Sequence, residues 1–121
     1  MILGVFHYAG SQVVINEFSA SNSGNIVDPD YGNSADWIEL FNSGDYPVNL
    51  NGYSITDNFT LPSKWIFSTD IILEPESYLI IWCDGMSNGL HTNFKLSAEG
   101  EEIAIFDANG TLLDSLSYTG Q

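Results

Sequence analysis

The chain has 121 residues, enough for one domain with its own hydrophobic core, and its 44% hydrophobic content excludes a disordered polymer. Its 16 acidic residues face only two lysines and no arginine, so the net charge is −14. Nucleic-acid binding depends on Lys and Arg contacts with phosphate, and this charge therefore argues against a nucleic-acid partner. No apolar stretch reaches the roughly 18 residues needed to cross a bilayer, so membrane insertion is not expected.

The apolar runs are short, and turn signals rich in Gly, Asn, Asp and Ser separate them. In chain order the runs are VVINEFSASN (13–22), DWIELFNSG (36–44), LNGYSITD (50–57), KWIF (64–67), YLIIWCDG (78–85), LHTNFKLS (90–97), EEIAIFD (101–107) and LLDSLSY (112–118). Apolar residues nowhere recur at helical spacing over three turns. Many short strands of this kind predict an all-β sandwich or barrel with almost no helix.

Two pairs of runs predict hairpins. Residues 101–107 and 111–118 flank Ala108-Asn109-Gly110, and an Asn-Gly pair readily takes the positive φ angles of tight hairpin turns. Residues 78–83 end at Asp84-Gly85, and the chain is expected to return through 90–97.

The second run predicts a strand with two different faces. Ile38 and Leu40 point to one side, whereas Trp37, Glu39 and Phe41 point to the other. One set is expected in the core and the other partly under a neighbouring loop. The alternation alone does not decide which is which.

In their order and spacing these runs resemble the lamin tail domain, the immunoglobulin-like globular domain of nuclear lamins, which also occurs in bacterial secreted proteins. The resemblance covers about Val13 to Tyr118. It implies an immunoglobulin-like β-sandwich of about seven to nine strands that carries no catalytic residues. We therefore expect a domain over 13–121, preceded by an N-terminal extension or cloning remnant over 1–12.

The long connection over 19–35 is the candidate metal site. Asp28, Asp30 and Asp36, with Asn33, place carboxylates and an amide close together in sequence, as calcium-binding loops do. The alternative is an acidic turn in which Asp and Asn side chains bond to their own backbone. Apart from this candidate Ca²⁺ site, we expect no cofactor.

Two other residue sets have a functional and a structural interpretation. Glu17 and Glu39 could act as a glycosidase acid–base pair, but we favour carboxylates that face solvent or pair with Lys64, Lys95 or backbone donors. Aromatic residues could form a platform for sugar rings, but we expect most of them in the core. They are Trp37, Trp65, Trp82, Tyr31, Tyr46, Tyr53 and Tyr78.

Cys83 is the only cysteine, so no intrachain disulfide forms, and its apolar run predicts a buried thiol. A catalytic thiolate would need His7 or His91 as base, and neither lies in a nucleophile motif. These two His residues also provide no zinc ligand set.

We accordingly expect a non-enzymatic interaction or attachment module, an accessory domain of a larger exported bacterial protein. Its location would be extracellular or in the cell envelope, and its partner a protein or a cell-surface polymer. The chain has neither coiled-coil heptads nor a basic import signal, so the nuclear roles of lamins are not expected. The alternative is a carbohydrate-binding β-sandwich module, assisted by Ca²⁺.

Overall fold

The computed structural model describes residues 12–20, 29–30, 35–97 and 101–119, and these form nine β-strands and no helix. The strands are β1 (Val13–Ser19), β2 (Asp36–Asn42), β3 (Val48–Asn49), β4 (Ser54–Thr56), β5 (Trp65–Ile66), β6 (Ile72–Leu73), β7 (Tyr78–Cys83), β8 (Glu101–Phe106) and β9 (Leu112–Tyr118). The predicted all-β class and strand number are thus confirmed. The described part of the chain holds no helix long and apolar enough to cross a membrane.

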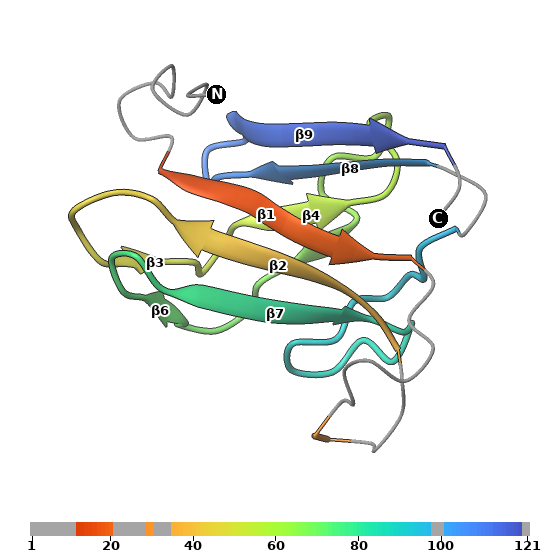
Figure 1. Cartoon of the computed structure of the whole chain (residues 1–121), viewed down its shortest axis with the longest axis horizontal. Helices are drawn as coiled ribbons and strands as arrows, with labels where there is room; N and C mark the ends of the chain where they lie inside the picture. Colours follow the sequence, from red (N-terminus) through yellow and green to blue (C-terminus); the bar gives the residue numbers. More distant parts are fainter. Residues whose placement is uncertain (1–11, 21–28, 31–34, 98–100, 120–121) are drawn as a thin grey trace.

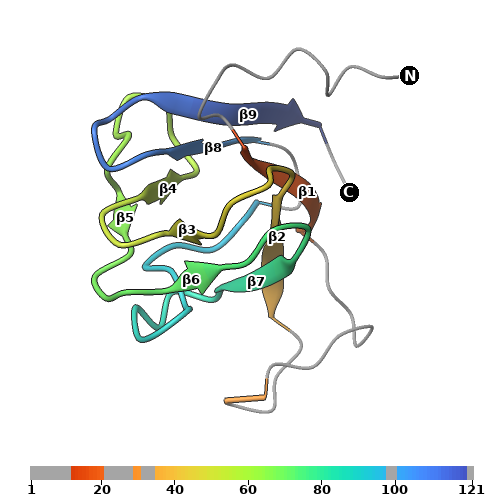
Figure 2. The same cartoon turned by 90° about the vertical axis from the view of Figure 1, so that its left-hand side faces the viewer.

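The strands form two main layers. One is a three-stranded sheet in the order β1-β2-β7, and the other is a four-stranded sheet in the order β5-β4-β8-β9. A small sheet of β3 and β6 lies beside them, and every strand pair is antiparallel. Figure 1 looks onto the three-stranded sheet, and Figure 2 shows the two layers side by side.

The core lies between the two layers. Its fully buried side chains alternate along the strands, which is why strands with this spacing pack as a sandwich. They are Ile38 and Leu40 on β2, Ile55 on β4, Ile81 on β7, and Ile103 and Ile105 on β8. Near one edge the rings of Phe18 and Tyr118 lie 4.7 Å apart, and Asp114 of β9 accepts a hydrogen bond from the Ile15 backbone N–H of β1.

The predicted hairpin of β8 and β9 is confirmed, with a modified turn. Gly110 has a φ of 83°, whereas Asn109 does not have a positive φ. The Asp107 carboxylate accepts hydrogen bonds from the N–H groups of Asn109 and Thr111, which holds the turn without a left-handed Asn109. One left-handed residue, the glycine, is therefore sufficient here.

The second predicted hairpin is wrong. Residues 90–97 form no strand and make only two isolated bridges, a parallel one from His91 to Trp82 and an antiparallel one from Lys95 to Asp84. A single reversal after β7 would bring the chain back antiparallel to that strand. The parallel bridge therefore requires a second reversal before His91 lies beside Trp82. Ser87 and Gly89, with φ of 54° and 58°, lie between these two residues. The segment after β7 is thus a folded loop rather than a return strand.

Candidate functional site

The three-stranded sheet has an outer face opposite the core. Ile38 and Leu40 are the β2 residues that face the core, with no exposed surface. Because neighbouring residues of a strand point to opposite sides, Trp37, Glu39 and Phe41 lie on the outer face. This settles the choice that the alternation in the sequence left open.

The strand register arranges the outer face in three rows across β1, β2 and β7. One row is Val14, Phe41 and Tyr78, the next is Glu17, Glu39 and Ile80, and the third is Ser19, Trp37 and Trp82. A β-bulge between Ile15 and Glu17 places Glu17, rather than Asn16, opposite Glu39. The first two rows form what we call the acid–aromatic face: Val14, Glu17, Glu39, Phe41, Tyr78 and Ile80.

The apolar row of this face is open to solvent at its β7 end. Tyr78 is 56% exposed, and its ring lies 4.6 Å from that of Phe41, centroid to centroid. Phe41 and Val14 beside it are partly exposed. A stacked aromatic pair on a flat sheet presents rigid apolar area, which is the kind of surface that anchors a partner.

The acidic row brings two carboxylates together. Glu17 and Glu39 are direct cross-strand partners, an arrangement that destabilises a sheet when both carry the same charge. Glu39 accepts a hydrogen bond of 2.9 Å from the Asn16 amide. Among the described residues, neither glutamate forms an ion pair, since Lys64 instead lies 2.7 Å from Asp57. Of the expected alternatives, pairing with Lys64 or Lys95 is not seen in the described part of the chain, and the exposed Glu17 and partly exposed Glu39 carry charges that no cation neutralises there.

The third row, Ser19, Trp37 and Trp82, lies at the other end of the outer face and is mostly buried. Trp37 and Trp82 retain only 8% and 6% exposure although they lie on the outer side of the sheet. Trp65 is buried in the core, as expected, and none of the three indoles provides a flat sugar platform. The Trp37 indole N–H has no hydrogen-bond partner within the described part of the chain.

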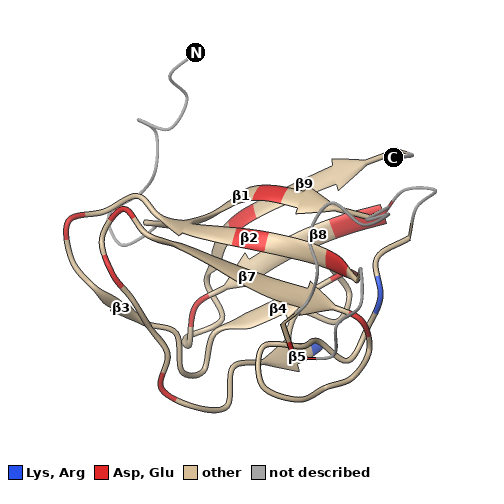
Figure 3. Cartoon of the chain, turned by 60° about the horizontal axis from the view of Figure 1, so that its bottom comes forward, with Lys and Arg blue, Asp and Glu red and all other residues tan. Residues whose placement is uncertain are grey.

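The charge of the molecule is spread over many elements rather than gathered in one patch. Figure 3 shows acidic residues on β1, β2 and β8 and in several loops, whereas lysine occurs at only two places. Any partner that approaches the acid–aromatic face therefore meets negative charge over a wide area. Such a field favours a positively charged partner and accelerates its association.

A second polar cluster joins the 84–97 segment to the long connection before β2. His91 is buried, and its Nδ1 lies 2.6 Å from Asp84 while its Nε2 lies 2.7 Å from Asp30. Only the imidazolium form can donate from both nitrogens at once. We call these three side chains the His91 clasp. The Asp84 carboxylate is nearly buried and the Asp30 carboxylate is 60% exposed.

The clasp gives Asp30 a partner other than a metal ion. Asp28, the first member of the predicted Ca²⁺ set, lies outside the described residues, as does Asn33. Asp36 begins β2 and is paired in register with Cys83. Among the described residues, no group of three or more His, Cys, Asp or Glu side chains could hold a metal ion. The Ca²⁺ site at Asp28, Asp30 and Asp36 stays a prediction.

Cys83 is buried beside these carboxylates, as its apolar run predicts. It is 1% exposed, and burial raises the pKa of its thiol, with the negative charges of Asp36 and Asp84 acting in the same direction. A thiol kept protonated in this way is a poor nucleophile. Cys83 is therefore part of the core.

The sequence interpretation missed the clasp. Asp30 and His91 are 61 residues apart, and the contact depends on the loop reversal that the hairpin prediction did not include. The separation of seven residues between Asp84 and His91 was visible, but a side-chain contact across that interval requires the same reversal. The acid–aromatic face could be found more easily, because its β2 members follow from simple alternation.

Comparison with known families agrees with this architecture. The lamin tail domain profile matches residues 7–120. The match begins inside the segment 1–12 that was predicted to be an extension. A search of curated proteins gives no match. Domains of this family have an immunoglobulin-like β-sandwich fold. They are generally protein-interaction modules and typically non-catalytic.

Proposed function

This chain belongs to the lamin tail domain family, and we propose that it is a non-catalytic module that docks a protein partner on its acid–aromatic face. The observation that carries the proposal is the register of the three strands. It places an unneutralised Glu17–Glu39 pair beside the stacked rings of Phe41 and Tyr78. Both features are unfavourable for an isolated domain and favourable for one that receives a partner.

The chemistry of the face selects the partner. Two adjacent carboxylates favour a Lys or Arg side chain, and Arg can bind a carboxylate through two parallel hydrogen bonds. The neighbouring row of Val14, Phe41 and Tyr78 favours an apolar or aromatic side chain next to that cation. The expected ligand is a basic segment of a protein with apolar residues close to its Lys or Arg.

A larger protein is the proposed setting. The chain would be an accessory domain that holds an exported bacterial protein to a protein partner or a cell-surface polymer. The acidic composition supports this setting over the chromatin-facing role of nuclear lamins, because a charge of −14 opposes approach to nucleic acid. The complete coding region tests it, and we expect a secretion signal and further domains around this one.

Selection from a random peptide display library tests the docking face. We expect wild-type protein to enrich peptides that combine Lys or Arg with aromatic or aliphatic residues. The double variant Glu17→Gln/Glu39→Gln should lose this enrichment, because it keeps the shape of the face and removes its charge. Selected peptides without basic residues, or equal enrichment by the variant, would refute the proposal.

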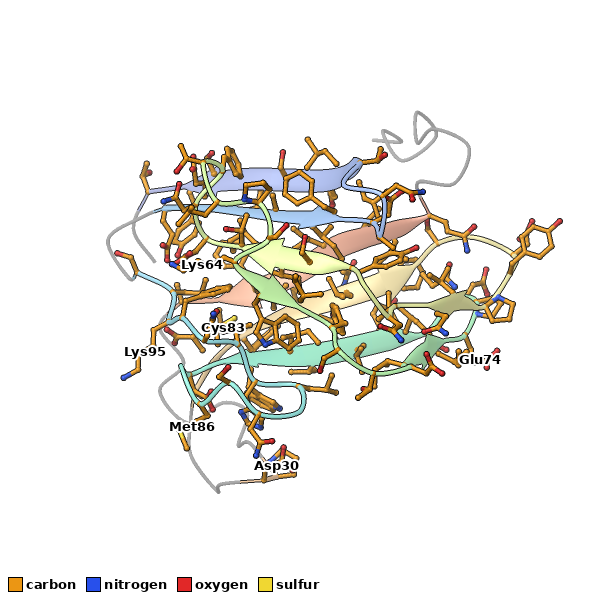
Figure 4. All side chains as sticks on the ribbon, turned by 180° about the vertical axis from the view of Figure 1, so that it is seen from behind. Asp30, Lys64, Glu74, Cys83, Met86 and Lys95 are labelled. Atoms are coloured by element: carbon orange, nitrogen blue, oxygen red, sulfur yellow. The ribbon has the colours of Figure 1, made fainter. Side chains whose placement is uncertain are left out.

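The control must remove the same charge elsewhere. Asp45→Asn/Glu74→Gln removes two exposed carboxylates outside the acid–aromatic face. Figure 4 shows Glu74 at the end of the molecule opposite Asp30, Met86 and Lys95. This control should retain the wild-type enrichment, since general attraction of cations by the whole molecule changes equally in both double variants.

A further inference from the structure

A groove runs between β5 with the segment that follows it and the loop after β7. It consists of two adjoining cavities of about 300 and 380 Å³, which share Ser68 and Gly89 in their walls. These volumes reach the lower end of ordinary ligand sites, about 300 to 1,000 Å³. The groove shares no lining residue with the acid–aromatic face.

The walls of the groove mix hydroxyl and amide side chains with apolar ones. Among the described residues no Asp or Glu lines either cavity, although the chain has 16 acidic residues. Lys64, the one cation among the described lining residues, is neutralised by Asp57 at 2.7 Å, and its Nζ lies 5.4 Å from the centre of the Phe94 ring. The groove therefore offers hydrogen bonds without favouring either an anion or a cation.

The hydroxyl groups are available to a ligand. Ser63, Ser68 and Ser87 are exposed, and their side-chain oxygens make no hydrogen bond within the part of the chain that the structure describes. Apolar surface lies between them, contributed by the half-exposed Ile66 and by the edge of Trp65. Alternating hydroxyl and C–H surface is also the pattern that a sugar ring presents.

The groove is held in shape before any ligand arrives. The Asn93 amide donates a 2.8 Å hydrogen bond to the Lys64 carbonyl, which ties its two sides together. The Ser87 N–H donates to the Thr92 carbonyl, and the Trp82 N–H donates to the Leu90 carbonyl. Ser87 has a φ of 54°, a left-handed conformation that is costly for a residue other than glycine. A residue held in a left-handed conformation by surrounding hydrogen bonds is a feature that clusters at ligand-binding sites.

We infer that this groove binds an uncharged oligosaccharide, with one sugar ring in each of the two adjoining cavities. The hydroxyl groups of Ser63, Ser68 and Ser87 would bond to sugar hydroxyls, while Ile66 and the Trp65 edge would contact the ring C–H groups. This site is independent of the protein-docking face. It also differs from a surface aromatic platform, because the buried indoles cannot serve as one.

NMR titration of the ¹⁵N-labelled protein with neutral hexasaccharides tests the inference. The probes are cello-, xylo-, manno- and chitohexaose, and a hexamer of galacturonic acid serves as the charged comparison. We expect at least one neutral probe to shift the amide signals of 63–69 and 87–93, and the galacturonate hexamer to leave them unchanged. No shift with any neutral probe at 20 mM, or shifts that map elsewhere, would overturn the inference.

A groove-filling variant adds a second measurement. Ser68→Tyr places a ring where the two cavities meet, and should weaken binding by at least about tenfold. Ser117→Tyr is the matched control, since Ser117 is exposed on β9, at the opposite edge of the four-stranded sheet from β5. Undiminished binding by Ser68→Tyr would contradict the site even if the sugar bound. Folding of both variants is checked by their amide spectra.

Discussion

Asn42 at the end of β2 organises the loop that follows it. It is fully buried, and its amide nitrogen donates to the carbonyls of Tyr46 and Leu73 at 2.8 and 2.9 Å. Its oxygen accepts from the Gly44 N–H and from the Gln12 amide. A buried amide with all four hydrogen bonds made is stable, whereas the groups around it become costly once it is removed.

Asn42→Leu should therefore destabilise the domain by about 2 to 4 kcal/mol, because it removes the acceptor of the Gly44 N–H and a donor to the carbonyls of Leu73 and Tyr46. The Tyr46 carbonyl keeps one hydrogen bond, from the Gln12 amide. Urea denaturation gives the change in the free energy of unfolding. Asn51→Leu is the matched control: Asn51 is exposed and bonds to Asp70 at the surface, so about 1 kcal/mol or less is expected. Similar losses in both variants would show that the Asn42 network contributes little.

Cys83 gives a prediction at the same scale. Because it is 1% exposed and burial raises its thiol pKa, we expect almost no reaction with DTNB in the native protein at pH 8. In 6 M guanidinium chloride the same reagent should titrate one thiol per chain. Fast labelling of the native protein would mean that β7 opens frequently or that the thiol lies at the surface.

Among the elements, the loop after β7 depends on the His91 clasp. Its two contacts have nearly equal lengths but very different burial, with the Asp84 side chain 13% exposed and the Asp30 side chain 60% exposed. Asp84→Ala should cost about 2 to 4 kcal/mol, because it removes the nearly buried carboxylate that pairs with the buried imidazole of His91. Asp30→Ala should cost about 1 kcal/mol or less, as solvent screens that pair. Equal losses in urea denaturation would contradict this assignment.

The elements also show how far sequence reasoning extends. The alternation in β2 and the turn residues between β8 and β9 are local signals. From them the β2 strand and the β8–β9 hairpin were predicted correctly. The loop over 84–97 was not, because its apolar residues look like those of a strand. Leu90, Phe94 and Leu96 in fact pack on the core from a folded loop. Contacts such as Asp30 with His91 join distant segments, and no local pattern encodes them.

At the scale of the whole molecule, charge governs which partners can approach. Only Lys64 and Lys95 oppose 16 acidic residues, and Lys64 is already paired with Asp57. We therefore expect no binding to duplex DNA in fluorescence anisotropy, even at 20 mM salt, where the attraction of basic proteins to phosphate is strongest. Salt-sensitive binding in the micromolar range would show that a basic site outweighs this charge.

The measurement that tests the docking face most directly is the affinity of a display-selected basic peptide for two single-tyrosine variants. Tyr78 lies in the stacked pair of the acid–aromatic face, whereas Tyr46 is more exposed, at 71%, but lies in the loop between β2 and β3. Calorimetric titration should show that Tyr78→Ala weakens binding at least about tenfold, the effect of losing one central aromatic contact. Tyr46→Ala should bind as the wild type does. Unchanged affinity in Tyr78→Ala, or an equal loss in both variants, would contradict docking on this face.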